Sequence, residues 1–471
     1  MSVLAGLSPE RVFYYFERIA AIPHPSGDTA ALRDYCAEFA KAQGLRYATD
    51  NGGNVVIYKP ASAGYEEHPT LILQGHLDMV CEAEESCKQD FTKEGIKLRI
   101  TGDTVRACGT TLGADNGIAV AMALAILEDD SIPHPPLEVL FTADEEVGLL
   151  GAAALDGSLL SGRRLINIDS EDEGVFTVAC AGGLRAEMRL PVCRSASDGY
   201  LTRLSLSGYL GGHSGIEIGN GRRNAILDLF SLLRTVPALR LVGAEGGGKD
   251  NAIPRTVSAS VLTPSPIDES ALQSLFSAFL KEEAEAALVL EAEGYTEVDT
   301  LTEDATKNLL SFTASLPNGV LAMSRDIEGL VETSLNLGVL SVTDEEAVFA
   351  SGVRSSVNSD RAALSEKLAA LTEAHGGDYK THGAYPAWEY RKDSPLRDAA
   401  ARVFEGLYGF APRVEAIHAG LECGLLSDKL PGLDSISMGP ELHHVHTPEE
   451  SMSISSVART YNFLLELIKE L

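Results

Sequence analysis

The stretch Thr70–Val80, TLILQGHLDMV, decides how the first part of the chain is interpreted. Residues Thr70–Leu73 are a short apolar run, which is typical of a β-strand buried on both faces. His76 and Asp78 follow with one residue between them, and alternate side chains of an extended segment point the same way. Both would therefore emerge at the carboxyl end of the strand. A histidine beside a carboxylate can bind a metal ion, but a single His-x-Asp pair often occurs by chance.

Two further apolar runs end in acidic residues. Leu137–Thr142 leads into the acidic triplet 144–146, and Leu165–Ile168 is followed by Asp169. Strands alternate with helical patterns across residues 1–180, which predicts an α/β sheet with parallel strands. In such sheets ligands bind beyond the carboxyl ends of the strands. Taken alone, each acidic turn is explained as well by simple solvation.

Residues 112–129, LGADNGIAVAMALAILED, predict a helix that is apolar nearly all round and therefore buried. Asp115 lies in its first turn. The simplest interpretation is that Asp115 caps the helix and complements the helix dipole. A metal-binding role for Asp115 needs support from other parts of the chain.

The pattern changes near residue 187 and changes back near residue 384. Between these points β-rich segments alternate with helices, which predicts an α+β domain. We therefore expect an α/β catalytic domain with a central, mostly parallel sheet, built from residues 1–186 and 384–471. Residues 187–383 would form an inserted lid or dimerisation domain.

Composition narrows the classes of function. The chain has 471 residues, 38 basic and 68 acidic side chains, and a formal charge of −30, which argues against nucleic acid and anionic membranes as partners. Its seven cysteines include no CxxC pair, as expected in a reducing compartment. The start lacks the features of a signal peptide, and no apolar run approaches the roughly 20 residues of a membrane helix. We expect a cytoplasmic protein.

The ends of the first-domain strands and the terminal HTPEE segment together offer two imidazoles and several carboxylates: His76, Asp78, Asp115, Glu145, Glu146, Asp169 and His446. This donor set suits Zn²⁺ or Mn²⁺ better than Mg²⁺ or Ca²⁺. Enzymes that hydrolyse acyl or phosphoryl bonds often use two such ions about 3.5–4 Å apart. Asp115 is a good candidate to bridge them. Of the adjacent Glu145 and Glu146, one can bind metal while the other accepts a proton.

The motifs GHLDMV, LGADNG, TADEEVGLLGA, NIDSED, GGHSG, NAIPR and HTPEE occur in this order and span essentially the whole chain. Together they resemble the dinuclear-zinc exopeptidase family, which includes carboxypeptidase, aminoacylase and dipeptidase members. HAGLECG at 418–424 and the terminal HTPEE favour the branch that cleaves Xaa-His dipeptides.

The resemblance implies a ligand set for two divalent ions, Zn²⁺ before Mn²⁺ or Co²⁺. His76 and Asp169 would bind one ion, and Glu146 and His446 the other. Asp115 would bridge the two, together with a hydroxide that attacks the peptide carbonyl.

The resemblance also implies roles beyond the ligands. Glu145 would be the general base and Asp78 would orient the metal-bound histidine. His213, in GGHSG, would reach across a homodimer formed by the inserted domain and stabilise the oxyanion. The residues implied in binding the dipeptide are Asn251, Arg354 and Gly420, and Arg354 is suited to the free carboxylate.

Other functions stay open at this point. An amidohydrolase acting on N-acyl amino acids would use the same metal residues. A catalytically silent, dimeric binding protein is a different class, although it would have no need of the non-ligand Glu145. A two-metal phosphoryl-transfer enzyme is disfavoured because the chain lacks a glycine-rich phosphate loop.

Overall fold

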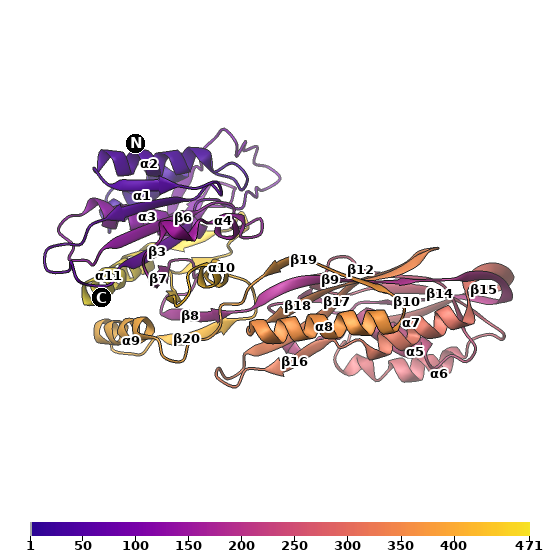
Figure 1. Cartoon of the computed structure of the whole chain (residues 1–471). Helices are drawn as coiled ribbons and strands as arrows, with labels where there is room; N and C mark the ends of the chain where they lie inside the picture. Colours follow the sequence, from indigo (N-terminus) through magenta and orange to yellow (C-terminus); the bar gives the residue numbers. More distant parts are fainter. Residues whose placement is uncertain (1) are drawn as a thin grey trace. The chain divides into compact units, whose positions relative to one another are not determined.

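The computed structural model describes residues 2–471 and consists of two compact units (Figure 1). Unit 1 contains the chain up to Ala179, Tyr390–Ala416 and Leu421–Leu471. Unit 2 contains Cys180–Glu389 and Ile417–Gly420. The unit boundaries at 179/180 and 389/390 differ by seven and six residues from the expected boundaries at 186/187 and 383/384. The short return at Ile417–Gly420, which we expected in the catalytic domain, belongs to unit 2, because its contacts are made there.

Unit 1 is built on an eight-stranded sheet. In sheet order its strands are β1 (Arg46–Thr49), β2 (Val55–Lys59), β6 (Leu137–Thr142), β3 (Leu71–His76), β7 (Arg164–Asn167), β21 (Asp434–Ser437), β8 (Val175–Cys180) and β20 (Arg413–Ile417). The pairs β6–β3, β3–β7 and β7–β21 are parallel. The pairs β1–β2, β2–β6 and β21–β8 are antiparallel. The predicted α/β fold is confirmed, with the parallel pairing confined to the centre of the sheet.

The helices of unit 1 are α1 (Glu10–Ala20), α2 (Ala30–Ala42), α3 (Ala114–Glu128), α4 (Leu150–Ala154), α9 (Pro395–Tyr408), α10 (Glu422–Lys429) and α11 (Ile454–Glu470), with a 3₁₀ turn at Gly157–Leu159. Helix α3 is buried along almost its whole length, as its apolar sequence predicts. A small sheet adds β4 (Leu98–Thr101), β5 (Thr104–Ala107), β22 (Leu442–His443) and β23 (Ser451–Ser453).

The register of the central strands aligns the polar residues that follow them. All six residues of β3 are buried, as expected for a strand covered on both faces. His76 pairs with Thr142 of β6, and Gln74 pairs with Asn167 of β7. Because these strands are parallel, the acidic turn after β6 and Asp169 after β7 both come to the edge where β3 ends.

Unit 2 is a two-layer α+β structure whose nine-stranded sheet is antiparallel in every pairing that its strands make. The strands are β15 (Ala287–Leu301), β10 (Arg194–Ser207), β14 (Val257–Thr263), β12 (Arg240–Gly247), β17 (Val331–Val342), β18 (Glu346–Ser355), β9 (Gly182–Pro191) and β19 (Asp378–Tyr385), with β16 (Gly319–Met323) beside β17. Strand β18 alternates strictly between buried and partly exposed residues, the pattern of a sheet covered on one face.

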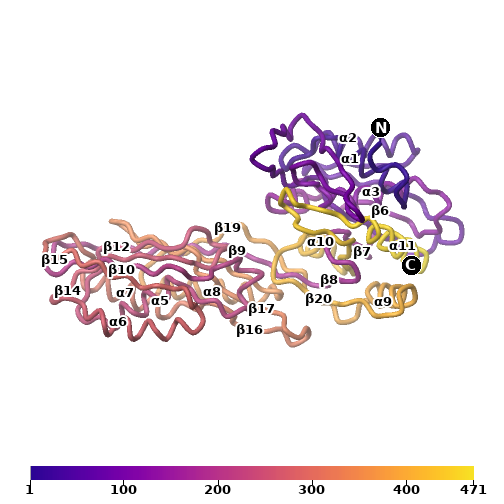
Figure 2. The backbone as a smooth tube through the Cα atoms, turned by 180° about the vertical axis from the view of Figure 1, so that it is seen from behind, coloured from indigo at the N-terminus to yellow at the C-terminus, as the bar shows by residue number. Residues whose placement is uncertain are grey.

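Helices α5 (Ala225–Leu233), α6 (Glu269–Phe276), α7 (Glu303–Ser315) and α8 (Asn358–Ala374) lie along one side of this sheet in both views (Figures 1 and 2). Buried side chains from the strands and these helices form one apolar cluster. A separate two-stranded ribbon pairs β11 (Gly212–His213) with β13 (Ala252–Ile253), and short 3₁₀ turns occupy Ile218–Asn220 and Phe279–Lys281. Among residues 2–471, none of the helices combines the length and apolar character needed to cross a membrane.

Candidate metal centre

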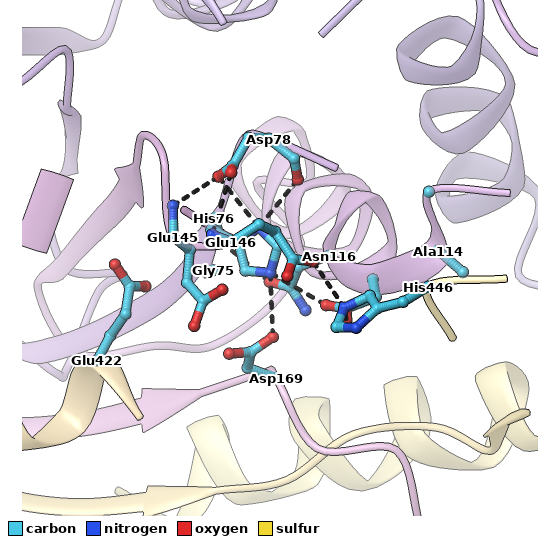
Figure 3. Close-up of polar contacts among 12 residues, drawn as sticks. Gly75, His76, Asp78, Ala114, Asn116, Glu145, Glu146, Asp169, Glu422 and His446 are labelled. Carbon is cyan, nitrogen blue, oxygen red and sulfur yellow. Dashed lines mark hydrogen bonds and ion pairs between the residues drawn. The ribbon is translucent and has the colours of Figure 1, made fainter. Parts of the chain in front are cut away.

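His76 lies at the end of β3 with its side chain almost fully buried, and two carboxylates face one of its ring nitrogens. His76 Nε2 is 3.0 Å from Asp115 Oδ1 and 3.4 Å from Asp169 Oδ1. Figure 3 shows Asp169 below the imidazole, joined to it by this contact. His76 at the end of β3 and Asp169 just after β7 therefore both lie beside Asp115 in the first turn of α3.

His446 completes a second group of contacts around the same aspartate. Its Nε2 is 3.2 Å from Asp115 Oδ2 and 2.9 Å from Glu146 Oε1. The two oxygens of Asp115 thus face two different imidazoles. The carboxylate of Asp115 therefore lies between two groups of side chains. His76 and Asp169 form one group, and Glu146 and His446 form the other.

The donor set fits divalent cations. Ligand atoms of His76, Asp115 and Glu146 all lie within 4.8 Å of one another. Imidazole nitrogens combined with carboxylate oxygens are suitable ligands for Zn²⁺ and Mn²⁺. A carboxylate that directs each oxygen to a different imidazole has the arrangement that a bridging ligand needs. The carboxylates of Asp115, Glu146 and Asp169 repel one another, and bound cations would relieve that repulsion.

The protonation of these residues depends strongly on their mutual contacts. Burial opposes the ionisation of Asp115, but hydrogen bonds with His446 and His76 outweigh it and hold the pKa of Asp115 well below its usual value. Hydrogen bonds to Asp115 and Glu146 raise the pKa of His446 to about 11. The pKa of His76 is also raised, because nearby acidic groups, Asp169 among them, overcome the opposing effect of burial.

The loop before α3 is held in place by a carboxylate far away in the sequence. Glu450, which is buried, accepts hydrogen bonds from the four consecutive N–H groups of residues 112–115 at 2.6–3.4 Å. The backbone at Asp115 is not helical, with φ −81° and ψ 101°, and the residue before the helix makes no side-chain cap. The side chain of Asp115 is directed at the imidazoles, so helix capping does not describe its role.

Asn116 ties α3 to two strand ends. Its Oδ1 accepts the backbone N–H of His76 at 3.1 Å, and its Nδ2 donates to the carbonyl of Ile168 at 2.6 Å. This approach requires a glycine at position 75, because a Cβ there would lie 2.6 Å from the side chain of Ala119. The Gly75–His76 dipeptide therefore lets the helix pack directly on the strand that carries the histidine.

Asp78 supports both the histidine and the acidic turn. Its carboxylate accepts the N–H groups of Glu145 at 2.8 Å and Glu146 at 3.2 Å, and the hydroxyl of Ser26 at 2.8 Å. The Nδ1 of His76 is 3.0 Å from the Asp78 backbone carbonyl and 3.5 Å from its carboxylate. The backbone carbonyl is therefore the nearer acceptor for the histidine, while the carboxylate mainly holds the acidic turn.

The pKa of the Glu145 carboxyl is raised well above its usual value. Burial is the largest cause, and the negative charges of Asp169, Glu422 and Glu146 add to it, against the opposing effect of His76. Glu145 makes none of the imidazole contacts described above. It therefore differs from its neighbour Glu146, which contacts His446.

The sequence did not point to Glu422 or Glu450. Glu422, the first residue of α10, is fully buried, and its Oε2 accepts hydrogen bonds from Gln74 at 2.6 Å and Thr142 at 2.7 Å. Burial raises the pKa of each of the two carboxyls to about 7. Both lie inside quoted motifs, HAGLECG and HTPEE, but an acid at a helix start or in a loop gives no sign of such burial.

The other predicted residues gather in unit 2. The β11–β13 ribbon pairs His213 with Ala252, and the carbonyl of Asn251 accepts the Ser214 N–H at 2.9 Å. A Cβ on Gly215 would lie 2.9 Å from His213 Cε1 and 3.2 Å from Arg354 Cζ.

Gly420 approaches the same group of residues through Tyr385. The Tyr385 ring lies against Gly420, and its hydroxyl accepts a hydrogen bond from Arg354 at 3.0 Å. Burial and the positive charge of Arg354 lower the pKa of His213. His213, Asn251, Arg354 and Gly420 therefore lie in one neighbourhood of unit 2, which also contains Tyr385.

The chain belongs to the M20/M25/M40 peptidase family, whose model matches residues 72–470. It is 38% identical to the cytosol non-specific dipeptidase of Escherichia coli (strain K12) over 485 aligned positions, which cover 100% of this chain and 99% of the relative. The predicted family resemblance is confirmed, and the chain is a metal-dependent peptide hydrolase.

Solved structures agree with this assignment. The aminoacylhistidine dipeptidase from Vibrio alginolyticus superposes with a TM-score of 0.93 at 36% identity, covering 99% of this chain and 98% of that one. The aminopeptidase PepT from Bacillus cereus shares the fold, with a TM-score of 0.57 at 17% identity over 98% of this chain and 99% of its own.

Proposed function

We propose that this chain is a dinuclear metal-dependent dipeptidase that accepts Xaa-His and other dipeptides. The observation that carries the proposal is the position of Asp115, whose two oxygens face His76 and His446 separately. The substrate class follows the names of two relatives that match this chain over nearly its full length, a non-specific dipeptidase and an aminoacylhistidine dipeptidase.

His76 and Asp169 would hold one cation, and Glu146 and His446 the other, with Asp115 shared between them. Zn²⁺ is the first candidate for this donor set, and Mn²⁺ and Co²⁺ are alternatives. Such cations supply Lewis acidity for the scissile carbonyl and lower the pKa of water. Proton transfer and stabilisation of the oxyanion are carried out by side chains of the protein.

Glu145 is the general base in this proposal. It takes the proton from the attacking water and passes it to the amine of the leaving amino acid. Its raised pKa favours holding that proton between the two steps, and positive charge placed next to it by cations would favour the ionised form that starts the cycle. Asp78 keeps the backbone of Glu145 and Glu146 in place through its two accepted hydrogen bonds.

The residues of this neighbourhood in unit 2 bind the dipeptide substrate in this proposal. Arg354 binds the free carboxylate of the dipeptide, and Asn251 and Gly420 line the same region. His213 stabilises the oxyanion, as a residue contributed across a homodimer formed by unit 2. Its lowered pKa keeps the ring neutral near pH 7, so that it binds the oxyanion as a hydrogen-bond donor. A cytoplasmic location is supported by the name of the Escherichia coli relative and by the chain's odd number of cysteines.

The first experiment is a hydrolysis panel with protein stripped of metal and reloaded with Zn²⁺, Mn²⁺ or Co²⁺. The panel holds β-alanyl-histidine, several Xaa-His and Xaa-Leu dipeptides, a tripeptide and an N-acetyl amino acid. We expect cleavage of the dipeptides and survival of the other two substrates. Cleavage of the N-acetyl compound alone would move the assignment to an amidohydrolase. Absence of any cleavage with two metals bound would contradict the proposal.

A further inference from the structure

Tyr385, the last residue of β19, has its ring in a slot kept open by two glycines. Its register partner on β9 is Gly183, where a Cβ would lie 2.6 Å from the Tyr385 hydroxyl. A Cβ on Gly420 would lie 2.7 Å from ring carbon Cε2. Neither position accommodates a side chain while the ring stays where it is. This gives a physical reason for glycine at position 420, which the family resemblance links to substrate binding.

The same glycine lets an arginine reach the phenol. Gly183 is also the register partner of Arg354 on β18, so Arg354, Gly183 and Tyr385 follow one another across three neighbouring strands. Opposed residues of antiparallel strands project from the same face of the sheet. Because Gly183 has no side chain, Arg354 Nη1 extends across it and donates to the Tyr385 hydroxyl at 3.0 Å.

Arg354 and Tyr385 offer hydrogen-bond donors that no carboxylate of the described chain accepts. Within the described chain, no carboxylate pairs with the Arg354 guanidinium, and the Tyr385 hydroxyl accepts from Arg354 without donating its own hydrogen to another residue. Both side chains are partly exposed. A partly exposed guanidinium that has no carboxylate partner, beside a phenol whose O–H is still free to donate, favours an anionic ligand.

We propose that Tyr385 is a substrate-binding residue, whose hydroxyl donates to the C-terminal carboxylate of the dipeptide while Arg354 binds the same group. The inference rests on the proposed function, because it requires a substrate with a free carboxylate. Tyr385 then selects free-acid peptides over peptides whose C-terminus is blocked as an amide. Its bond from Arg354 fixes the direction of the guanidinium at the same time.

The test compares a dipeptide with its C-terminal amide, using the metal-loaded Tyr385→Phe variant. Phenylalanine fills the same slot and removes only the hydroxyl. We expect kcat/KM for the free acid to fall about tenfold, mainly through KM, as for one hydrogen bond to a charged group. The amide should change less than about twofold. Tyr379→Phe is the matched control, because the Tyr379 hydroxyl lies on the same strand and pairs with Ser365 at 2.8 Å.

A double variant distinguishes carboxylate binding by Tyr385 from a role in packing alone. In an Arg354→Gln background, Tyr385→Phe should cost less than it does in the wild type, because both residues act on one group. Equal losses for acid and amide, or additive losses in the double variant, would overturn the proposal and leave Tyr385 a packing residue. Circular dichroism of each variant checks that the fold is retained.

Failure of the proposed function is recognised separately. If the wild-type enzyme cleaves no dipeptide, titration calorimetry with L-leucine and L-leucinamide still decides the inference. Tighter binding of the acid by the wild type, lost in Tyr385→Phe, supports carboxylate binding by Tyr385 although the dipeptidase assignment has failed. Equal affinity of the wild type for both compounds contradicts it.

Discussion

The polar site residues of unit 1 are a group of imidazoles and carboxylates in mutual contact, whereas those that we assign to substrate binding in unit 2 include no carboxylate. In unit 1, Asp115 contacts two imidazoles, and Asp78 accepts two backbone N–H groups of the acidic turn. In unit 2, Arg354 and Tyr385 reach each other across a bare glycine backbone, and His213 sits on a two-residue strand. The comparison suggests that changes in unit 1 alter metal content or chemistry, and changes in unit 2 alter binding and rate alone.

The largest effect is expected from Glu145→Gln. Removing the base should lower kcat by about 10²–10⁴-fold, while both metal ions stay bound. Steady-state kinetics and elemental analysis of the same sample measure the two quantities. Glu67→Gln, on an exposed loop, is the control for loss of one carboxylate. A nearly normal rate would remove Glu145 as the base.

His213→Ala tests the prediction for unit 2, that its residues affect binding and rate but not metal content. Loss of an oxyanion donor should lower kcat by about 10²–10³-fold, and metal content and thermal unfolding should match the wild type. Mixing this variant with Glu145→Gln protein examines the dimer, because a residue acting across subunits restores activity in mixed dimers. Unchanged turnover in His213→Ala would exclude the oxyanion role.

Asp115→Ala should weaken binding of both cations, by more than about 100-fold for each, since loss of a residue that only supports a ligand already costs 10–100-fold. Titration calorimetry against Zn²⁺ measures both sites. Two cations bound at wild-type affinity in this variant would argue against a shared ligand.

Metal affinity should also depend on pH. In the metal-free protein, hydrogen bonds to Asp115 and Glu146 raise the pKa of His446 to about 11, so its ring carries a proton at pH 7, and nearby acidic groups shift the pKa of His76 in the same direction. Cations displace protons from these rings, so the metal affinity should fall about tenfold for each unit by which the pH is lowered, for each proton released. Calorimetry in buffers of different ionisation enthalpy counts the protons. Binding without proton release would show that the rings are neutral before metal arrives.

Part of this centre could be predicted because some of its residues end or follow strands, while Asp115 and His446 were assigned as ligands through the family resemblance. His76, Asp169 and the acidic turn lie at fixed offsets after apolar runs, and parallel register brings such positions together. The expectation of a mostly parallel sheet was too simple, since β1 and β2 join it antiparallel. Glu422 and Glu450 escaped notice because their partners lie hundreds of residues away in the chain. No local pattern encodes such contacts.

The single carboxylate of Asp78 has an evolutionary consequence. It anchors the backbone of two neighbouring residues with different tasks, Glu145 and Glu146. Any substitution that shifts one of them shifts the other, so selection cannot tune proton transfer independently of the adjacent ligand. New substrate preferences are more accessible through unit 2, where Tyr385 or Arg354 can change without disturbing that shared anchor.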